Sequence, residues 1–382
     1  MKKQNKNNDA KNRSVTNTAL IQISSRGRDL MPWYKTWGTR IAAIVLALIV
    51  CAVVIVLLTG YNPLEVYSSM FSGSFGTSRK IWKTLQAVAM LLCISLAVTP
   101  AFKMKFWNIG AEGQTLIGGL AAAACMIYFG NEMPLVPCLL LTALASIIAG
   151  IIWGIIPAIF KAKFGTNETL FTLMMNYVAM QLVSFCIVYW ENPKDSNNVG
   201  VINRVTQGGW FPTIFDQKYF LNILIVAILT IFMYIYLRYS KHGYEISVVG
   251  ESENTARYIG INVNKVIIRT MALSGGLCGV AGLLLVSGTD HTINTSLVGG
   301  MGFTAIMVSW LAKFNPIFMT LTTFLIVFLE RGAGEIATAF KLNESVSDIL
   351  TGIILFFIIG SEFFVNYKVH FRSKHEKNGE GK

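Results

Sequence analysis

The sequence predicts an all-α fold, a polytopic bundle of about ten transmembrane helices in a lipid bilayer. Hydrophobic residues make up 53% of the 382 residues and charged residues only 14%, whereas a soluble domain carries about a quarter charged residues. The hydrophobic residues also gather into runs near the roughly 20 residues that cross a bilayer as a helix. Both observations favour a membrane protein over a large soluble core.

The apolar runs follow one another along the chain, separated by short polar or glycine-containing segments. Trp33, Tyr34 and Trp37 precede the first run and suit the membrane–water interface, where aromatic side chains gather. Only the two runs on either side of Lys313 are clearly short. We expect spans at about 41–59, 84–101, 108–129, 135–160, 169–190, 219–238, 266–288, 300–312, 315–329 and 348–366.

The distribution of positive charge predicts the orientation of the bundle. The formal charge is +12, and it is concentrated in the tails and in short loops, as the positive-inside rule requires. It therefore indicates an orientation in the membrane, with both termini cytoplasmic and no nucleic-acid partner. We expect cytoplasmic basic tails at 1–39 and 368–382, a transmembrane domain at 40–367, an external loop at 191–218 and a cytoplasmic segment at 240–265.

Two segments complete this topology. The segment 60–83 is an exception to the charge rule, because it places Arg79, Lys80 and Lys83 outside. Residues 1–30 are too polar to bury a core, and we expect them to be disordered.

Five spans in each half is an odd number, which predicts a 5+5 repeat of inverted halves with broken helices. The segment 108–114 then opens the third span of the first half, and 299–303 opens the third span of the second half. Glycine-interrupted segments at corresponding positions of two halves point to a transporter's binding site. The alternative is that these glycines only allow helices to pack closely.

The most informative polar residues lie at the start of the third run. Asn108, Glu112 and Gln114 stand between Gly110 and Gly113, although apolar spans normally avoid such side chains. An ionisable residue at membrane depth is costly and is therefore a hypothesis of function. We expect a broken or crowded helix beside a solute path. The alternative is that Glu112 is an acid favoured by the dipole at a helix N-terminus.

Other polar and small residues allow two interpretations each. Asn176, two turns beyond Glu168 in the fifth run, either lines a polar path or joins helices by hydrogen bonds. The small-residue ladder 274–282 indicates close helix packing. Asp290 and His291, in a short external segment, either gate the external mouth or are simply solvated.

The longest internal loop predicts a docking segment. Ser252 or Asn254 can cap a short helix that Gly260 ends. A short amphipathic helix on the cytoplasmic face suits docking to a partner subunit, and an ordinary connecting helix is the alternative. The residues that we expect to serve this docking are Glu251, Ala256, Arg257 and Gly260.

Motifs of catalysis are missing from the sequence. It contains no GxxxxGK[ST], HExxH or GxSxG pattern, so we expect no catalytic residues, no cofactor and no ATP hydrolysis by this chain. The six cysteines lie in apolar runs without CxxC spacing, which predicts neither disulfides nor a metal site. Energy for active transport must then come from an ion gradient or a separate ATPase.

Several blocks of residues together cover nearly the whole apolar part of the chain: Asn62–Glu65, Phe106–Gln114, Lys161–Thr169, Leu173–Tyr177, Ala256–Asn262, Ala272–Gly276 and Gly302–Pro316. In this order they resemble the permease subunits of bacterial ABC importers of the branched-chain amino acid, ribose and purine nucleoside superfamily, most closely the nucleoside-type branch. The NIGxEGQ pattern within Phe106–Gln114 is the most specific of them, and Thr304 departs from the Asp or amide that relatives often carry after Gly-Phe.

The resemblance implies a multi-pass permease in the bacterial plasma membrane that pairs with a second permease, as a homodimer or a heterodimer. Two cytoplasmic ABC ATPase subunits and an extracellular solute-binding lipoprotein would complete the importer. By this resemblance the segment 241–262, with the docking residues named above, would be the coupling region that sits on the ATPase. The solute of the importer would be a nucleoside, above all a purine nucleoside, and a simple sugar or a branched-chain amino acid is the alternative for the same machine. Two different classes of protein also stay open, an ion-coupled secondary transporter and a membrane scaffold. The translocation path would involve Asn108, Glu112, Gln114, Asn176, Phe303 and Thr304.

Overall fold

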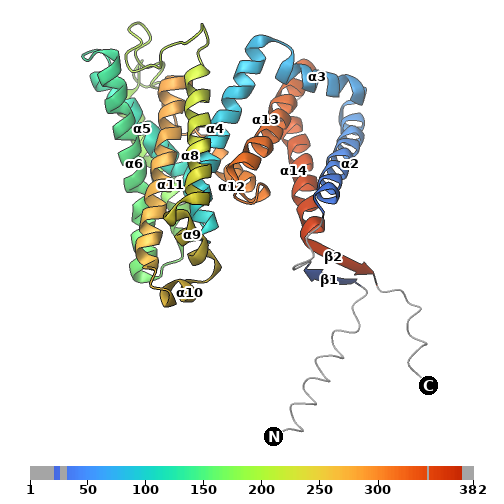
Figure 1. Cartoon of the computed structure of the whole chain (residues 1–382). Coiled ribbons are helices and arrows are strands. Elements are labelled where there is room, and N and C mark those ends of the chain that lie inside the picture. The colour runs from blue at the N-terminus through green and yellow to red at the C-terminus, as the bar shows by residue number, and fades with distance from the viewer. Residues whose placement is uncertain (1–20, 26–31, 342–343, 372–382) are drawn as a thin grey trace, which may run out of the picture. The chain divides into compact units, whose positions relative to one another are not determined.

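The computed structural model describes residues 21–25, 32–341 and 344–371. Each of the ten predicted spans corresponds to one helix, which confirms the helical membrane fold (Figure 1). Seven of the described helices are long and apolar enough to cross a membrane. The helices that match the spans are α2 (Trp33–Thr59), α4 (Ser78–Lys103), α5 (Ala111–Phe129), α6 (Leu135–Phe164), α7 (Glu168–Trp190), α8 (Phe220–Tyr239), α11 (Val263–Leu285), α12 (Met301–Leu311), α13 (Pro316–Ala339) and α14 (Glu344–Asn366).

The helices α3 and α13 depart from the expected spans, and α12 is shorter than a bilayer-crossing helix. The helix α3 (Pro63–Phe75) fills part of the segment expected to be a loop, and Glu65 lies in its first turn, where a helix N-terminus favours an acid. The helix α13 continues to Ala339, well past the predicted end at 329. The helix α12 has only 11 residues and, at about 1.5 Å per residue, it covers roughly half of a ~30 Å hydrocarbon core. The segment 300–312 therefore does not cross a membrane alone.

The described residues form two compact units, one comprising Met70–Gly332 and the other the chain up to Ser69 and from Ala333. In the second of these, α2 packs along α14. An ion pair of 2.9 Å between Arg40 and Glu362 joins these two helices.

The same unit contains two short strands that the sequence did not predict. β1 (Ile21–Ser25) pairs antiparallel with β2 (Tyr367–Phe371). The expectation of disorder is therefore wrong for Ile21–Ser25, where apolar and polar residues alternate as in a strand. Residues 1–20 and 26–31 lie outside the described residues.

The core of Met70–Gly332 is built on α4 and α11, the second predicted span of each half. Both are mostly buried inside the unit, and they pack against each other. α4 ends beside the helix α9 (Lys241–Glu251), whereas α11 begins near α9 and runs away from it (Figure 1). The two helices are therefore antiparallel, as inverted halves require.

The small-residue ladder on α11 brings backbones into direct contact. A Cβ added at Gly275 would lie 2.2 Å from the carbonyl oxygen of Gly150 on α6. A Cβ at Gly279 would lie 2.3 Å from the carbonyl oxygen of Ser146 on the same helix. The interpretation of this ladder as a packing surface is confirmed, because only glycine permits so close an approach.

Candidate functional site

The chain between α4 and α5 is not helical, and this break takes up the first residues of the predicted third span, whereas α5 itself is one continuous helix. α4 ends at Lys103, and Lys105 adopts a left-handed φ of 61°. Residues 106–109 then run without regular structure to α5, which begins at Ala111. Irregular backbone at membrane depth is tolerated only where other groups satisfy its N–H and C=O groups. The buried polar side chains around it meet that need.

The side chain of Asn108 is the centre of the first set of hydrogen bonds. Its Nδ2 donates to Gln114 Oε1 at 3.3 Å and to Ser274 Oγ at 3.2 Å. Its Oδ1 accepts from the Gly110 N–H at 3.0 Å and from Gln114 Nε2 at 3.2 Å. Asn108 and Gln114 thus form a reciprocal amide pair that ties the break to α11.

Two residues of α7 satisfy the backbone of the same segment. Asn176 Nδ2 donates to the Ile109 carbonyl at 2.9 Å, and its Oδ1 accepts from the Gly113 N–H at 2.9 Å. The hydroxyl of Thr172 accepts from the Ile109 N–H at 3.1 Å. Asn176 therefore fixes the backbone at the start of α5. The hydrogen bond of Thr172 was not predicted from the sequence.

Glu112 joins the starts of two helices that lie far apart in the sequence. Its two carboxylate oxygens accept from the N–H groups of Gly300 and Gly302, each at 2.8 Å. Gly300 has a φ of 81°, a left-handed conformation that favours glycine, and it caps the N-terminus of α12. A carboxylate at a helix N-terminus is stabilised by the dipole and by charge-assisted hydrogen bonds. The predicted third spans of the two halves thus begin against each other, and we call this contact the α5–α12 joint.

The polar side chains at the start of α5, including that of Glu112 in the joint, are enclosed by protein. Asn108 is 0% exposed, Glu112 4%, Gln114 1% and Asn176 2%. Phe303 is exposed on α12 instead, and the Thr304 hydroxyl donates to the Gly300 carbonyl at 3.5 Å. The structure therefore brings four of the six predicted path residues into one region, and the path itself stays a prediction.

The predicted docking segment folds as two helices, α9 and α10 (Glu253–Tyr258). Ser252 Oγ accepts from the Thr255 N–H at 3.2 Å, so the predicted cap is confirmed. Gly260 follows α10 with a φ of 83°. Glu251, Arg257 and Gly260 are exposed, and Arg257 lies 3.8 Å from Glu253.

Ala256 is buried against the bundle, so its small side chain serves packing of α10 rather than presenting a surface. The side chain that α10 does present is Tyr258, which is 92% exposed and which sequence reasoning missed. An exposed aromatic side chain beside a charged one is a common anchor in protein interfaces.

α9 is fixed to both central helices. A Cβ at Gly250 would lie 2.2 Å from the carbonyl oxygen of Lys103, at the end of α4. Glu245 on α9 pairs with Arg269 on α11 at 2.8 Å. The hydrogen bond from Arg269 lowers the pKa of the Glu245 carboxyl, which therefore stays charged near neutral pH.

An apolar cluster fills the space between α9, α10 and the central helices. It includes Met104 and Phe106, which lie four and two residues before Asn108 in the sequence. Packed side chains therefore connect α9 and α10 to the non-helical segment that precedes α5. The cluster consists of Ala101, Met104, Phe106, Ala158, Ile246, Val249, Ala256, Val263, Val266, Ile267 and Met271.

Comparison with protein families matches residues 81–359 to the family described as "Branched-chain amino acid transport system / permease component". The chain belongs to this family. This permease is therefore a transport subunit embedded in a membrane, as its apolar helices also indicate.

The permease is also similar to curated relatives over most of its length. The glucose ABC transporter permease protein TsgB13 of Haloferax volcanii is 26% identical over 91% of this chain and 94% of that protein. The nucleoside ABC transporter permease protein NupB of Lactococcus lactis is 30% identical, covering 80% of this chain and 86% of that protein. The guanosine ABC transporter permease protein NupP of Bacillus subtilis is 30% identical, covering 84% and 92%.

Proposed function

We propose that this permease forms part of the membrane-spanning path of an ATP-driven importer that carries a nucleoside, with purine nucleosides first, across a bacterial plasma membrane. The two relatives at 30% identity are named for nucleoside and guanosine transport, and this observation carries the proposal. The sugar alternative keeps support from the glucose permease at 26% identity.

In this proposal the topology follows the charge pattern. The tails 1–39 and 368–382 and the segment 240–265 are cytoplasmic, and the loop 191–218 of the transmembrane domain 40–367 is external. The loop and the helices α9 and α10 lie at opposite ends of the unit Met70–Gly332 (Figure 1), which supports this assignment. The partners are two cytoplasmic ATPase subunits, a second permease and an extracellular solute-binding lipoprotein.

The proposed mechanism uses the contacts between the coupling helices and the α5–α12 joint. Closure of the ATPases moves α9 and α10, and the apolar cluster transmits that movement to the end of α4 and to Asn108. In the present conformation the polar side chains at and near the α5–α12 joint are buried in protein. Parting α5 from α12 would expose Glu112 and the N–H groups of Gly300 and Gly302 to a polar solute, with Phe303 and Thr304 also on α12.

The identity of the solute is tested with the importer reconstituted in proteoliposomes with its ATPases, second permease and binding protein. We expect uptake of radiolabelled guanosine to be reduced by excess unlabelled adenosine and unaffected by excess glucose or leucine. If glucose alone or leucine alone reduced the uptake, we would conclude that the solute is a sugar or a branched-chain amino acid instead of a nucleoside.

The role of α10 is tested by replacing Tyr258 with alanine. We expect the affinity of the detergent-solubilised permease for its ATPase to fall about tenfold or more, because truncation of an exposed aromatic anchor removes interface energy. ATP-driven uptake should fall with it. Tyr189→Ala, which truncates an exposed tyrosine at the opposite end of the unit, serves as the control. Equal ATPase affinity in the two variants would exclude Tyr258 from the interface.

A further inference from the structure

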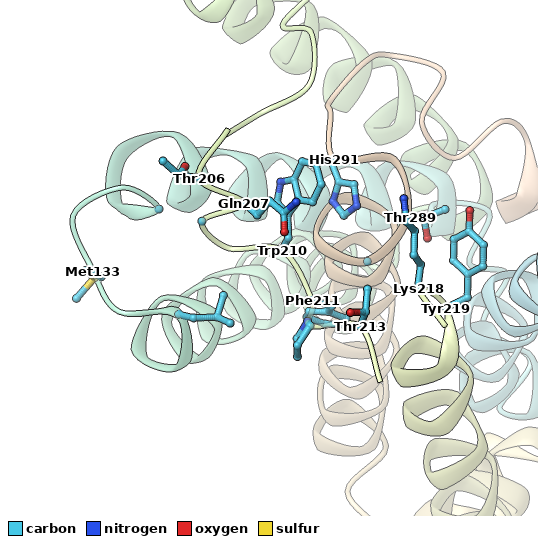
Figure 2. A pocket seen from close by; sticks show the side chains of 15 residues that line it. Met133, Thr206, Gln207, Trp210, Phe211, Thr213, Lys218, Tyr219, Thr289 and His291 are labelled. Carbon is cyan, nitrogen blue, oxygen red and sulfur yellow. The ribbon is translucent and has the colours of Figure 1, made fainter. Parts of the chain in front are cut away.

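A cavity of about 530 Å³ (Figure 2) lies beside the loop 206–219, at the end of the unit opposite α9 and α10 in Figure 1. Its volume falls within the roughly 300–1,000 Å³ of small-molecule sites. The loop 206–219, the turn between α5 and α6 and the π-helical segment η2 (Val286–Asp290) that ends α11 provide its walls. None of the predicted path residues lines it.

The loop that covers the cavity is held by hydrogen bonds to the end of α11. The Ile202 N–H donates to the His291 carbonyl at 2.8 Å, and the Phe211 N–H donates to the Ser287 carbonyl at 2.9 Å. The indole Nε1 of Trp210 donates to the Ile202 carbonyl at 2.9 Å. The cavity is therefore formed before any ligand arrives, which favours binding.

The cavity has a flat aromatic side. The rings of Trp210 and His291 are stacked, with centroids 3.7 Å apart and an interplanar angle of 6°. Figure 2 shows this pair together with Lys218, Tyr219 and Thr289 around the cavity. Burial, with a smaller effect of Lys218, lowers the pKa of His291 to about 4, so the ring is neutral near pH 7.

Two buried amides support the Thr289 side of the cavity. Gln86 Nε2 and Asn222 Nδ2 both donate to the hydroxyl of Thr289, which lines the cavity. These two residues are 4% and 1% exposed and lie behind the lining, with Asn222 Oδ1 packed against Gly288. The polar side chains that line the cavity itself include Gln207, Thr213 and Lys218, which can exchange hydrogen bonds with a ligand.

The charge of the lining selects among solutes. Lys218 is the charged side chain among the described residues that line the cavity, and none of these residues is acidic. An amino acid would bring an ammonium group with no carboxylate to receive it. A sugar would bring hydroxyl donors but no flat ring for the aromatic pair. A nucleoside brings both a flat ring and several donors.

We propose that this cavity is a vestibular binding site for a neutral nucleoside, separate from the α5–α12 joint. The base stacks against the Trp210–His291 pair, and the hydroxyl or amine groups of the nucleoside meet the polar side chains of Gln207, Thr213 and Lys218 in the lining. The site would receive solute from the binding protein before the path opens. This inference rests on the proposed function, since it assumes that the transported solute is a nucleoside.

Binding of radiolabelled guanosine to the full permease chain in lipid nanodiscs, without ATPase or binding protein, tests the proposal. We expect saturable binding that Trp210→Ala weakens roughly 5- to 150-fold, the range that corresponds to loss of one base–aromatic stack. Trp210→Phe keeps an aromatic plane and should bind within about threefold of wild type. Val205→Ala changes a side chain of the same loop that is 94% exposed and should have no effect.

A second measurement does not depend on any variant folding correctly. Photolabelling of the unaltered permease with 8-azidoguanosine should modify peptides within 206–219 or 286–291, and unlabelled guanosine should prevent it. Absence of saturable binding, equal binding by Trp210→Ala, or label confined to the α5–α12 joint would overturn the vestibular site. If the reconstituted importer still takes up guanosine in that case, the proposed function stands and only this inference fails.

Discussion

Replacing Glu112 with alanine is expected to abolish ATP-driven uptake and to lower the free energy of unfolding by about 2 to 6 kcal/mol. The N–H groups of Gly300 and Gly302 each lose an acceptor, and each unsatisfied buried donor costs about 1–3 kcal/mol. The N-terminus of α12 also loses the negative charge that complements its dipole. Unfolding in mixed detergent micelles and uptake into proteoliposomes measure the two effects.

Two further variants separate the causes. Glu112→Gln keeps the shape and one carbonyl acceptor, so its loss of stability should be about half as large. Glu132→Ala removes an exposed acid beyond the end of α5 and should leave stability within about 0.5 kcal/mol of wild type. If Glu112→Ala is as stable and as active as Glu132→Ala, the joint has no part in the fold or in transport.

Replacing Gly275 with alanine is expected to have the next largest effect, a loss of stability of about 3 kcal/mol with little folded protein recovered. The new methyl carbon would stand 2.2 Å from the Gly150 carbonyl oxygen, so α11 and α6 must separate. Both helices contact α5, whose start is part of the joint. Thermal unfolding of the detergent-solubilised permease measures the change.

Gly352→Ala is the matched control for this second substitution. A Cβ at Gly352 would meet nothing within 4 Å, and the residue lies inside α14. Alanine there should stabilise the helix by about 0.5–1 kcal/mol, because glycine loses more backbone entropy on folding. Equal melting temperatures for the two variants would show that the packing of α11 on α6 is looser than its backbone contacts imply.

The sequence predicts the helices of this permease well, because apolar runs report directly on membrane spans. The amphipathic helix α3 has a weak apolar signal and escaped prediction. The start of α12 was predicted to within one residue, but the end of α13 was not, since this helix continues to Ala339 through the charged residues Glu330, Arg331 and Glu335. Length and hydropathy therefore give the number of segments but not where each one ends.

The sequence identifies Glu112 as unusual but not its partners. The groups that donate to its carboxylate are backbone N–H groups 188 and 190 residues away. A sequence does not show which glycine N–H groups will serve as hydrogen-bond donors. The correspondence of inverted halves was the one signal that related the two segments. The stacking of Trp210 on His291 joins a loop to the end of α11 and has no periodic signal at all. Its discovery required the three-dimensional arrangement.

The most direct test of the account compares two energy sources for the same permease in proteoliposomes. The chain paired with its second permease is supplied in one case with a sodium or proton gradient and in the other with ATPase, binding protein and enclosed ATP. We predict guanosine uptake in the second case and none in the first. Uptake driven by the ion gradient without ATPase or binding protein would contradict the account and make this chain a secondary transporter.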